Sequence, residues 1–520
     1  MALSVSPLGT AALAALAAAL LLLAMQVLRP LLAVRGRLPP GPPHSLLTGT
    51  AIPDTHPWRT MAEWTRRYGD VCTVRVGPAQ LLFVVGTARA AHALLNKQAG
   101  VSSGRPRNIM AGELMSGGKR MLIMDHNDRW RTYRKVMHEA LADRPAQAYE
   151  PVQVKESRLA MQRLGDGPAD WQNVWRTYAA SVIMTVTYDQ PVTSLDDPRV
   201  RAVNERLGML ARYVRPGASM LDRFPLLYYI PEPLNPWVKL GKQLHARELD
   251  LFLSQYQAVR TRVKAGEGSA SFSSKLQERQ EKIHLTDEEA SYMAGSLFGA
   301  GSDTTAAALS IFVMAMLRFP HVLRQAAAEV DRVVGEKRMP TFEDEAALPF
   351  IQACVQETMR WRPVSAGGFM HRLTADVQWE GYTLPKDSSI IGNHWSISLD
   401  ENEYPEPDVF KPERFLDETG QCKGTWFSPQ DGHVAFGFGR RICPGMHVAN
   451  RSLFINFASL AWAFNITSSV PAEETDTLAF TSAANSHPLP FEAHFEWRSE
   501  ARRAVCEDEV QTTKDNQIHG

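Results

Sequence analysis

One cysteine lies in a glycine-rich stretch near the end of the chain, which reads Phe436-Gly437-Phe438-Gly439-Arg440-Arg441-Ile442-Cys443-Pro444-Gly445. An apolar pattern with helical spacing follows from Val448 to Leu460, so we expect Cys443 where a loop enters a helix. Backbone N–H groups at a helix N-terminus favour an anion, which predicts a lowered thiol pKa and a stabilised thiolate. The glycines allow a large flat partner to approach the backbone closely.

The same stretch resembles the haem-binding loop of the cytochrome P450 superfamily, whose pattern is F-x-x-G-x-R-x-C-x-G. The fixed positions are occupied here by Phe436, Gly439, Arg441, Cys443 and Gly445. The resemblance implies that haem b is the cofactor and that Cys443 is the axial thiolate ligand of its iron. It also places Phe436 and Arg441 at the cofactor, with Arg441 pairing with a haem propionate. The competing interpretation is a buried structural cysteine on a turn, and the flanking pattern disfavours it.

Two further stretches contribute to the expected haem site. Trp130 and Arg134 stand four residues apart and share a helix face. The resemblance implies that this W-x-x-x-R pair binds a haem propionate. On the pair alone, a packing tryptophan with a solvated arginine is the alternative. His371 or Arg372 is also expected to reach a propionate, and His371 is favoured.

A long apolar helix is predicted over residues 291–317, and polar residues interrupt it at Ala300-Gly301-Ser302-Asp303-Thr304-Thr305. Glycine and hydroxyl residues are costly in the middle of a helix, so they indicate either function or close packing on a neighbour. The run matches the family pattern [AG]-G-x-[DE]-T-[TS]. The resemblance implies that Gly301 opens a groove for dioxygen and that Thr304 hydrogen-bonds the oxygen. Asp303 would then feed protons through ordered water.

A structural ion-pair set is expected from Glu357 and Arg360, which stand three apart on one helix face, and from Arg414. As a surface pair the first two residues would contribute little. They resemble the family's E-x-x-R motif, which the later arginine completes. A buried set of this kind is costly to leave incomplete, so we expect it to hold the Cys443 loop.

The first residues predict a membrane anchor at 1–29. Residues 8–28 are almost wholly apolar, and about 20 apolar residues suffice to span a bilayer. Arg29, Arg35 and Arg37 follow this run, which by the positive-inside rule places the catalytic domain in the cytosol. A cleaved signal peptide is the alternative, and its basic first region is missing. We therefore expect a single-pass protein of the endoplasmic reticulum membrane.

After the anchor we expect a basic, proline-rich hinge at 30–43, one catalytic domain at 44–498 and a polar, disordered tail at 499–520. The resemblance implies a mainly α-helical fold with a small β-rich lobe, the cytochrome P450 fold. A hairpin should open the lobe, because residues 72–76 alternate and residues 81–85 are apolar across a Gly-Pro turn.

Several segments are expected to border the substrate. Residues 98–125 have weak periodicity and predict a loop, which in the family covers the substrate. Residues 363–370 and 480–487 are expected to line the substrate space. The apolar stretch 224–230 is either core or a lid that dips into the bilayer, and the sequence favours neither.

Composition excludes some classes of function. The chain has 520 residues and a formal net charge of zero, so nucleic acid is not an expected partner. The five cysteines include no C-x-x-C pair, which indicates neither a zinc site nor a disulfide framework. This use of cysteine suits a reducing compartment. Separately, we expect the protein to be a monomer.

The resemblance implies a monooxygenase that inserts one oxygen atom into a hydrophobic small molecule. NADPH-cytochrome P450 reductase would supply the electrons and dock near Arg131, Lys135 and Arg440, whose charges could attract an acidic partner. The chain is most similar in character to fungal enzymes of secondary-metabolite biosynthesis, such as the O-methylsterigmatocystin oxidoreductase-like group.

Other functions stay open at this point. A haem-thiolate isomerase, dehydratase or peroxygenase is one alternative, and the presence of both Asp303 and Thr304 argues against it. A monooxygenase that detoxifies foreign compounds is another. A membrane-anchored haem sensor or carrier without turnover is disfavoured, since no second axial ligand stands near residue 304.

Overall fold

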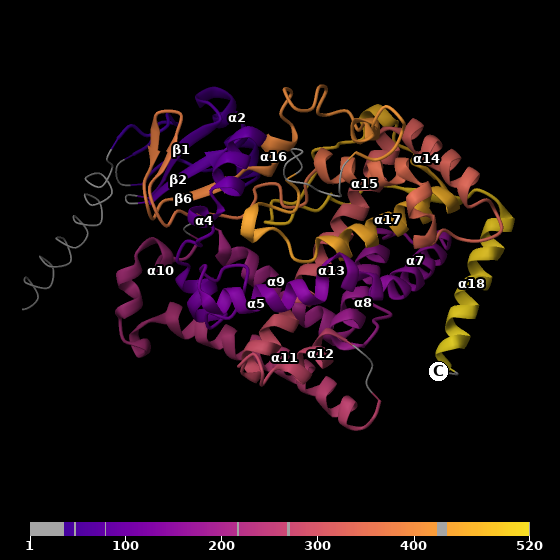
Figure 1. Cartoon of the computed structure of the whole chain (residues 1–520), viewed down its shortest axis with the longest axis horizontal. Coiled ribbons are helices and arrows are strands. Elements are labelled where there is room, and N and C mark those ends of the chain that lie inside the picture. The colour runs from indigo at the N-terminus through magenta and orange to yellow at the C-terminus, as the bar shows by residue number, and fades with distance from the viewer. Residues whose placement is uncertain are drawn as a thin grey trace, which may run out of the picture.

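The computed structural model describes most of the chain, namely residues 36–45, 48–77, 80–215, 218–267, 271–423 and 434–518. Helices form the body, and a small β-rich lobe lies beside them at the upper left of Figure 1. This confirms the predicted mainly helical class with a small β-rich lobe. The predicted anchor at 1–29 lies outside the described residues, as does the first part of the hinge.

The β-rich lobe is built on the predicted hairpin. Strand β1 (Val71–Val76) pairs antiparallel with β2 (Gln80–Val85), whose apolar run is buried because side chains cover both faces of the sheet. Strand β2 pairs in parallel with β6 (Ser389–Gly392), and β6 pairs antiparallel with β3 (His371–Arg372). The order β1-β2-β6-β3 therefore joins His371 to the sheet that the N-terminal hairpin begins.

Two smaller hairpins complete the strands. Strand β4 (Val377–Trp379) pairs with β5 (Tyr382–Leu384), and the turn between them holds Gly381 at a φ of 80°. Strand β7 (Phe464–Thr467) pairs with β8 (His494–Trp497) near the end of the chain. The second hairpin brings the residues after 480 back toward the helical body.

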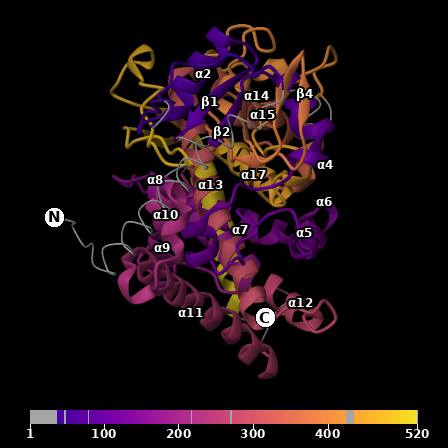
Figure 2. The same ribbon diagram turned by 90° about the vertical axis from the view of Figure 1, so that its left-hand side faces the viewer.

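The core is organised around α13 (Asp287–Arg318), which confirms the long helix predicted over 291–317. Its N-terminus is capped by a reciprocal pair of hydrogen bonds between Thr286 and Glu289. Helices α8 (Gln172–Tyr188), α11 (Pro236–Lys264) and α17 (Met446–Ala463) pack around it, as Figures 1 and 2 show. Among the described residues, α13 alone is long and apolar enough to cross a membrane, and 78% of its most apolar window is buried inside the protein.

Shorter elements surround this core. The segment 98–125 was predicted as a loop, but it contains a short α-helix and a π-helix. The side chain of Asn108 caps the N-terminus of the π-helix. The remaining helices are α2 (Pro57–Tyr68), α3 (Ala88–Ala91), η1 (His92–Lys97), α4 (Ala99–Ser102), η2 (Ile109–Met115), α5 (Asp128–Leu141), α6 (Asp143–Ala146), η3 (Gln147–Tyr149), α7 (Glu150–Gly165), α9 (Pro198–Val214), α10 (Met220–Arg223), η4 (Pro225–Tyr229), η5 (Glu232–Leu234), α12 (Phe272–Arg279), α14 (Pro320–Val333), η6 (Phe342–Ala347), α15 (Pro349–Trp361), α16 (His394–Ser398), η7 (Pro412–Phe415), η9 (Gly439–Arg441) and η10 (Ala472–Glu474).

The prediction of a disordered tail from residue 499 is wrong. Residues Glu500–Ile518 form helix α18, which packs against α7 and is drawn in yellow in Figures 1 and 2. Its own Cys506 and Val510 are buried against the body. Arg502 of the same face is also buried and pairs with Asp331 at 2.7 Å, so this face of the helix is bound to the body rather than solvated.

Most apolar side chains of the stretch 224–230 lie outside the core, although Leu227 and Tyr228 are half-buried against a small hydrophobic cluster. The stretch forms η4 and its flanks, and Tyr229 is 71% exposed, with Phe224, Leu226 and Ile230 also exposed. The core interpretation is therefore wrong for these side chains. Contact with a bilayer stays a prediction.

Candidate active site

The cysteine loop is a tight turn fixed by its own backbone. Cys443 follows η9 and precedes α17, and its N–H donates to the carbonyl of Phe436 at 2.8 Å. Gly439 adopts a φ of 51°, and a Cβ there would lie 2.5 Å from the carbonyl oxygen of Leu95. The N–H of Gly439 also donates to Oδ1 of Asn96 at 2.8 Å, which adds a second contact with the same segment. The loop is thus held against η1, and a side chain at residue 439 would prevent it.

The electrostatics of the thiol differ from the sequence-based expectation. Burial raises the pKa of Cys443 above the ordinary thiol value, and the N–H of Gly445 and the charge of Arg134 only partly oppose this. The expected net lowering of the pKa is wrong for the free thiol. A bound metal ion deprotonates a coordinating thiol outright, so the amide and the arginine assist a thiolate that only coordination makes stable.

Arg441 lies in a cage of backbone carbonyls. Its Nε donates to the carbonyl of Ser103 at 2.9 Å, and its Nη2 donates to that of Met124 at 2.9 Å. The guanidinium stacks over the ring of Trp130, 4.4 Å from the ring centroid. The structure therefore brings two of the predicted site residues, from α5 and from the cysteine loop, into direct contact.

Arg134 and Arg105 approach the same place from other segments. Nη1 of Arg134 donates to the carbonyl of Ile442, next to the cysteine, at 2.5 Å. Nε of Arg105 donates to the carbonyl of Leu122 at 2.9 Å, and its Nη1 donates to that of Met370. We call Arg105, Arg134 and Arg441 the arginine cluster, because the charge of Arg441 lowers the pKa of Arg105 and the charge of Arg134 lowers the pKa of Arg441.

Sequence reasoning missed Arg105. Its hydrogen-bond partners are backbone carbonyls of residues 122 and 370, which any sequence could supply. A lone Gly-Arg-Pro in a segment of weak periodicity carries no motif. Only the burial of an arginine would have marked the residue, and burial is a property of the fold.

His371 is buried beside the arginine cluster. Its Nδ1 donates to the carbonyl of Ser102 at 2.8 Å. Burial lowers its pKa well below the ordinary histidine value, and the charges of Arg105 and Arg441 lower it further. A neutral ring that donates through Nδ1 has only an acceptor at Nε2, so Arg105 is better suited than His371 to bind an anion here. Arg372, the other residue considered for binding a propionate, instead donates to Asp387 at 2.8 Å.

The polar interruption of α13 is accessible although the helix around it is buried. Ala300 and Thr304 are not buried, and Oγ1 of Thr304 donates to the carbonyl of Ala300 at 3.0 Å. A Cβ on Gly301 would lie 2.7 Å from Cγ1 of Ile183 in α8. This glycine therefore serves the close packing of α13 on α8, and the expected groove for dioxygen stays a prediction.

Asp303 is held by partners that the sequence did not indicate. Nε2 of His487 donates to its Oδ1 at 2.8 Å, and Nδ2 of Asn485 donates to its Oδ2 at 2.9 Å. Burial works to raise the pKa of Asp303, but His487, Asn485 and the charge of Arg176 outweigh it and the net pKa is lowered. The turn at 480–487 was predicted to border the substrate, and its contact with α13 could not be inferred from sequence spacing.

The predicted ion-pair set is present. Arg360 donates to Glu357 through Nε at 2.6 Å and through Nη2 at 2.7 Å, and Nε of Arg414 lies 3.5 Å from Oε1 of the same carboxylate. The N–H of Lys411 also donates to Glu357 at 2.7 Å. These contacts join α15 to η7. Their role in holding the Cys443 loop stays a prediction.

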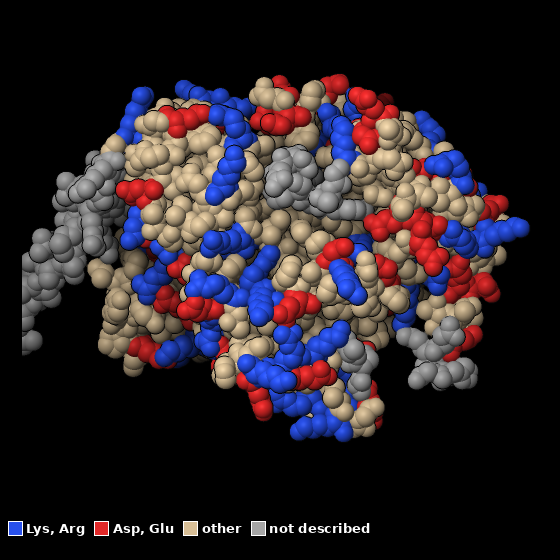
Figure 3. All heavy atoms as spheres, viewed as in Figure 1, with Lys and Arg blue, Asp and Glu red and all other residues tan. Residues whose placement is uncertain are grey.

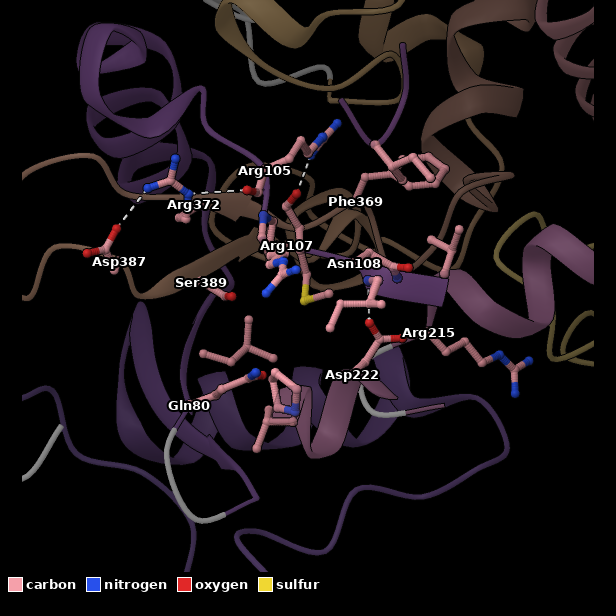
Figure 4. A pocket seen from close by; sticks show the side chains of 18 of the residues that line it. Gln80, Arg105, Arg107, Asn108, Arg215, Asp222, Phe369, Arg372, Asp387 and Ser389 are labelled. Atoms are coloured by element: carbon pink, nitrogen blue, oxygen red, sulfur yellow. Dashed lines mark hydrogen bonds and ion pairs between the residues drawn. The ribbon is translucent and has the colours of Figure 1, made fainter. Parts of the chain in front are cut away.

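A cavity of about 280 Å³ opens between the β-rich lobe and the segment that contains α10. Figure 4 shows Arg105 and Phe369 on one side of it and Asp222 and Arg215 on the other. Phe369 and Met370, which the sequence placed along the substrate space, both line it. Because Arg105 also belongs to the arginine cluster, the cavity reaches the candidate site.

Comparison with known proteins assigns the family. The family model of cytochrome P450 matches residues 39–492. Cytochrome P450 monooxygenase 64 of Postia placenta is 42% identical over 492 residues, which cover 94% of this chain and 97% of that protein. The chain belongs to the cytochrome P450 family. A cytochrome P450 monooxygenase of Armillaria gallica is 35% identical over 480 residues (91% of this chain, 92% of that protein), and cytochrome P450 monooxygenase virE of Hypocrea virens is 34% identical over 482 residues (91% and 87%).

This cytochrome P450 is a haem-thiolate monooxygenase of the fungal type, and it works with a redox-partner reductase on a hydrophobic substrate. Its arginine cluster fits the propionates of haem. Burial and the charge of Arg441 lower the pKa of Arg105 to about 9, and burial lowers the pKa of Arg441 to about 10. Among the described residues, Asp125 is the carboxylate whose charge raises the pKa of Arg441. Asp125 is already bound by Arg372 at 2.6 Å. Buried cations need an anion, and the two haem carboxylates would supply it, with Cys443 as the iron ligand.

Proposed function

We propose that this cytochrome P450 takes its electrons from NADPH through NADPH-cytochrome P450 reductase and inserts one oxygen atom into a hydrophobic small molecule of fungal secondary metabolism. The second oxygen atom leaves as water, with two electrons and two protons consumed. The enzyme acts as a monomer anchored in the endoplasmic reticulum membrane, with its catalytic domain in the cytosol.

The observation that carries this proposal is the placement of Cys443 beside the arginine cluster, in which Arg105 is buried and Arg134 and Arg441 are half-buried. Arg105, Arg441 and Arg134 would bind and orient the cofactor through its carboxylates, and the Trp130 ring would cover the Arg441 guanidinium. When bound, haem supplies the activation of dioxygen, and a thiolate ligand favours O–O cleavage.

The protein's own part of the reaction is the supply of protons. Asp303 and Thr304 lie in the accessible stretch of α13, and Thr304 keeps acceptor capacity while its hydroxyl donates to Ala300. Asp303 would hold a proton at a carboxylate oxygen and release it toward the reacting oxygen. The apolar side chains of Phe369 and Met370 favour a hydrophobic substrate and exclude water.

The reductase would dock on the face formed by Arg131 and Lys135 of α5 and Arg440 of the cysteine loop. Arg440 and Lys135 are exposed, and Arg131 is also bound by Asp128. Figure 3 shows that Lys and Arg are interspersed with Asp and Glu over the visible face, so a docking site would depend on a local group of charges rather than on net charge.

The exposed apolar side chains near η4 support contact with a membrane close to the predicted anchor. Tyr229 and Leu234 are 71% and 76% exposed, which is unusual for large apolar residues in contact with water alone. Their burial in a bilayer would remove this cost.

A metabolite comparison tests the biosynthetic role. The source organism is compared with a strain that carries Cys443→Ala under conditions in which the protein is made. We expect one compound to disappear and a relative lacking one oxygen atom to accumulate. Identical profiles would contradict a dedicated biosynthetic step and favour a detoxifying monooxygenase. A lost product with the same oxygen content as its accumulated precursor would favour an isomerase, dehydratase or related haem-thiolate enzyme.

A further inference from the structure

We propose that His487 is a positioning residue for Asp303, which it holds through Nε2 and to which it passes protons from the solvent side. This inference rests on the proposed acid role of Asp303. It adds a histidine to the proton supply of the reaction, from a turn far from α13 in the sequence. The side chain of His487 is largely shielded at 16% exposed, whereas that of Asp303 is 35% exposed.

The carboxylate is held at both of its oxygens. His487 donates to Oδ1 at 2.8 Å and Asn485 donates to Oδ2 at 2.9 Å. Asn485 is in turn oriented by Ser365, whose Oγ donates to its Oδ1 at 3.0 Å. Two distinct donors on one carboxylate fix its rotation about the side-chain bond, so the acid has a defined direction before any substrate binds.

The histidine is itself held in place. The N–H of His487 donates to Oγ1 of Thr481 at 3.0 Å, and the N–H of Thr481 donates to the carbonyl of His487 at 2.8 Å. The N–H of Ser486 donates to the carbonyl of Val364 at 2.7 Å. The imidazole is therefore carried by a closed turn that is bound to the 364–365 segment, which is expected to border the substrate.

The surrounding charges favour an ionised Asp303. Arg176 of α8 acts on it from the neighbouring helix. At the other end of the turn, Nε2 of His56 donates to the carbonyl of Phe480 at 2.9 Å, and Arg215 donates to that of Ser482. These are the charged and titratable groups that the described residues place around the pair. A carboxylate in this setting rarely holds a proton of its own near neutral pH.

A histidine can supply that proton, because a protonated imidazole carries an N–H donor at each ring nitrogen and Nε2 of His487 lies 2.8 Å from Oδ1 of Asp303. The protonated ring gives its Nε2 proton to Oδ1 of Asp303, so that one N–H bond breaks and one O–H bond forms. Asp303 then releases the proton toward the reacting oxygen and becomes a carboxylate again. A hydronium ion from the solvent returns a proton to Nε2 and leaves as water, and both residues return to their starting state.

The alternative is a purely structural clamp, in which His487 only ties the turn to α13. His487→Gln separates the two, because the Gln amide can donate from a similar position but does not titrate. His487→Phe removes both properties. His494→Gln is the matched control, since His494 is an exposed histidine of β8 that pairs with Glu492.

The first measurement does not depend on turnover. The infrared carboxyl band of Asp303, assigned by its loss in Asp303→Asn, is followed as a function of pH in the full-length protein. We expect the band to titrate at higher pH in His487→Phe than in the unmodified protein and to be unchanged in His494→Gln. An unchanged titration in His487→Phe would overturn the proposed contact.

The second measurement follows the pH profile of electron use in vesicles that contain reductase, with oxygen, NADPH and no added substrate. We expect His487→Gln to reduce the water formed per NADPH by about 10- to 100-fold, to release peroxide instead, and to alter the pH profile relative to the unmodified protein. A profile like that of the unmodified protein in His487→Gln would overturn the relay and leave the clamp. If the unmodified protein oxidised no NADPH even when the accumulated compound of the metabolite comparison was added as substrate, the proposed function would fail, while the infrared result would still decide the contact.

Discussion

At the scale of single residues, the arginine cluster shows what a motif can and cannot indicate. Arg441 and Trp130 stand in recognisable patterns, and the structure places them in contact. Arg105 stands in no pattern, yet it is buried beside them and donates to two distant backbone carbonyls. A motif consists of side chains at a fixed spacing in the sequence. Arg105 is instead enclosed by backbone carbonyls that come together only in the folded chain.

Replacing this arginine should weaken haem binding. Each charge-assisted hydrogen bond contributes about 1.5–3 kcal/mol, so Arg105→Leu should lower haem affinity roughly 10- to 100-fold. The rate of haem transfer to an excess of an apoprotein acceptor measures it. Arg107→Leu is the control, because Arg107 lines the same cavity but is exposed and bound by Glu113. Equal haem loss from both variants would contradict a specific role for Arg105.

Asp303 makes a pH-dependent contribution to stability with a definite sign. Its folded-state pKa is below the ordinary carboxyl value, chiefly because His487 and Asn485 outweigh the effect of burial. The stabilisation is therefore present above the unfolded-state pKa of about 3.9 and is lost as the pH falls through the lower folded-state pKa.

We accordingly expect Asp303→Asn to lower the melting temperature at pH 7. The difference from the unmodified protein should shrink as the pH falls below about 4. Thermal unfolding monitored by circular dichroism across this range measures it. A difference that grows on acidification would show that the pKa shift has the opposite sign.

At the scale of elements, sequence periodicity succeeded where apolar residues mark a face and failed where they do not. The hairpin β1–β2 and helix α13 have strong apolar patterns and were predicted closely. Helix α18 was missed because its inward face contains Arg502, Cys506, Glu509 and Val510, of which only the cysteine and the valine are apolar. Ion pairs with α7 and α14 replace hydrophobic contacts there, and hydrophobic periodicity does not detect them.

Removing α18 should destabilise the protein. Ending the chain after Arg498 deletes the buried Cys506 and Val510 and leaves Arg158 without its partner Glu509. We expect a lower melting temperature and binding of a hydrophobic dye to the uncovered surface of α7. Ending the chain after residue 514 is the matched control and should preserve stability. Equal melting temperatures for the two truncated chains would contradict a structural role for this helix.

At the scale of the whole molecule, the order of the motifs along the chain determined most of the expected architecture. The cysteine loop precedes α17, the polar interruption lies in α13 and the Glu357–Arg360 pair lies in α15, and the structure assembles these three helices around one core. The contact between His487 and Asp303 could not be predicted in this way. It depends on how strands β7 and β8 return the chain to α13, which local patterns do not specify.

The docking of the reductase is a property of the whole surface and can be tested with charge reversal. Replacing Arg131, Lys135 and Arg440 together with Glu should slow reductase-supported reduction and reduce its dependence on ionic strength, while haem content stays unchanged. Stopped-flow reduction measures the rate. Reversal of Arg66 and Arg67 on α2, which lies apart from α5 in Figures 1 and 2, is the control. Unaltered reduction in the triple variant would exclude this face.

The seating of α18 against the body has a practical consequence for anyone who produces the protein. Shortening a chain to aid crystallisation usually begins with polar termini, and this C-terminus looks dispensable by composition. Here the last helix covers α7 and its end is exposed at the edge of the molecule (Figure 1). Affinity tags or fluorescent reporters should therefore be joined beyond residue 518 through a flexible spacer, and trimming should keep the helix at least to residue 514.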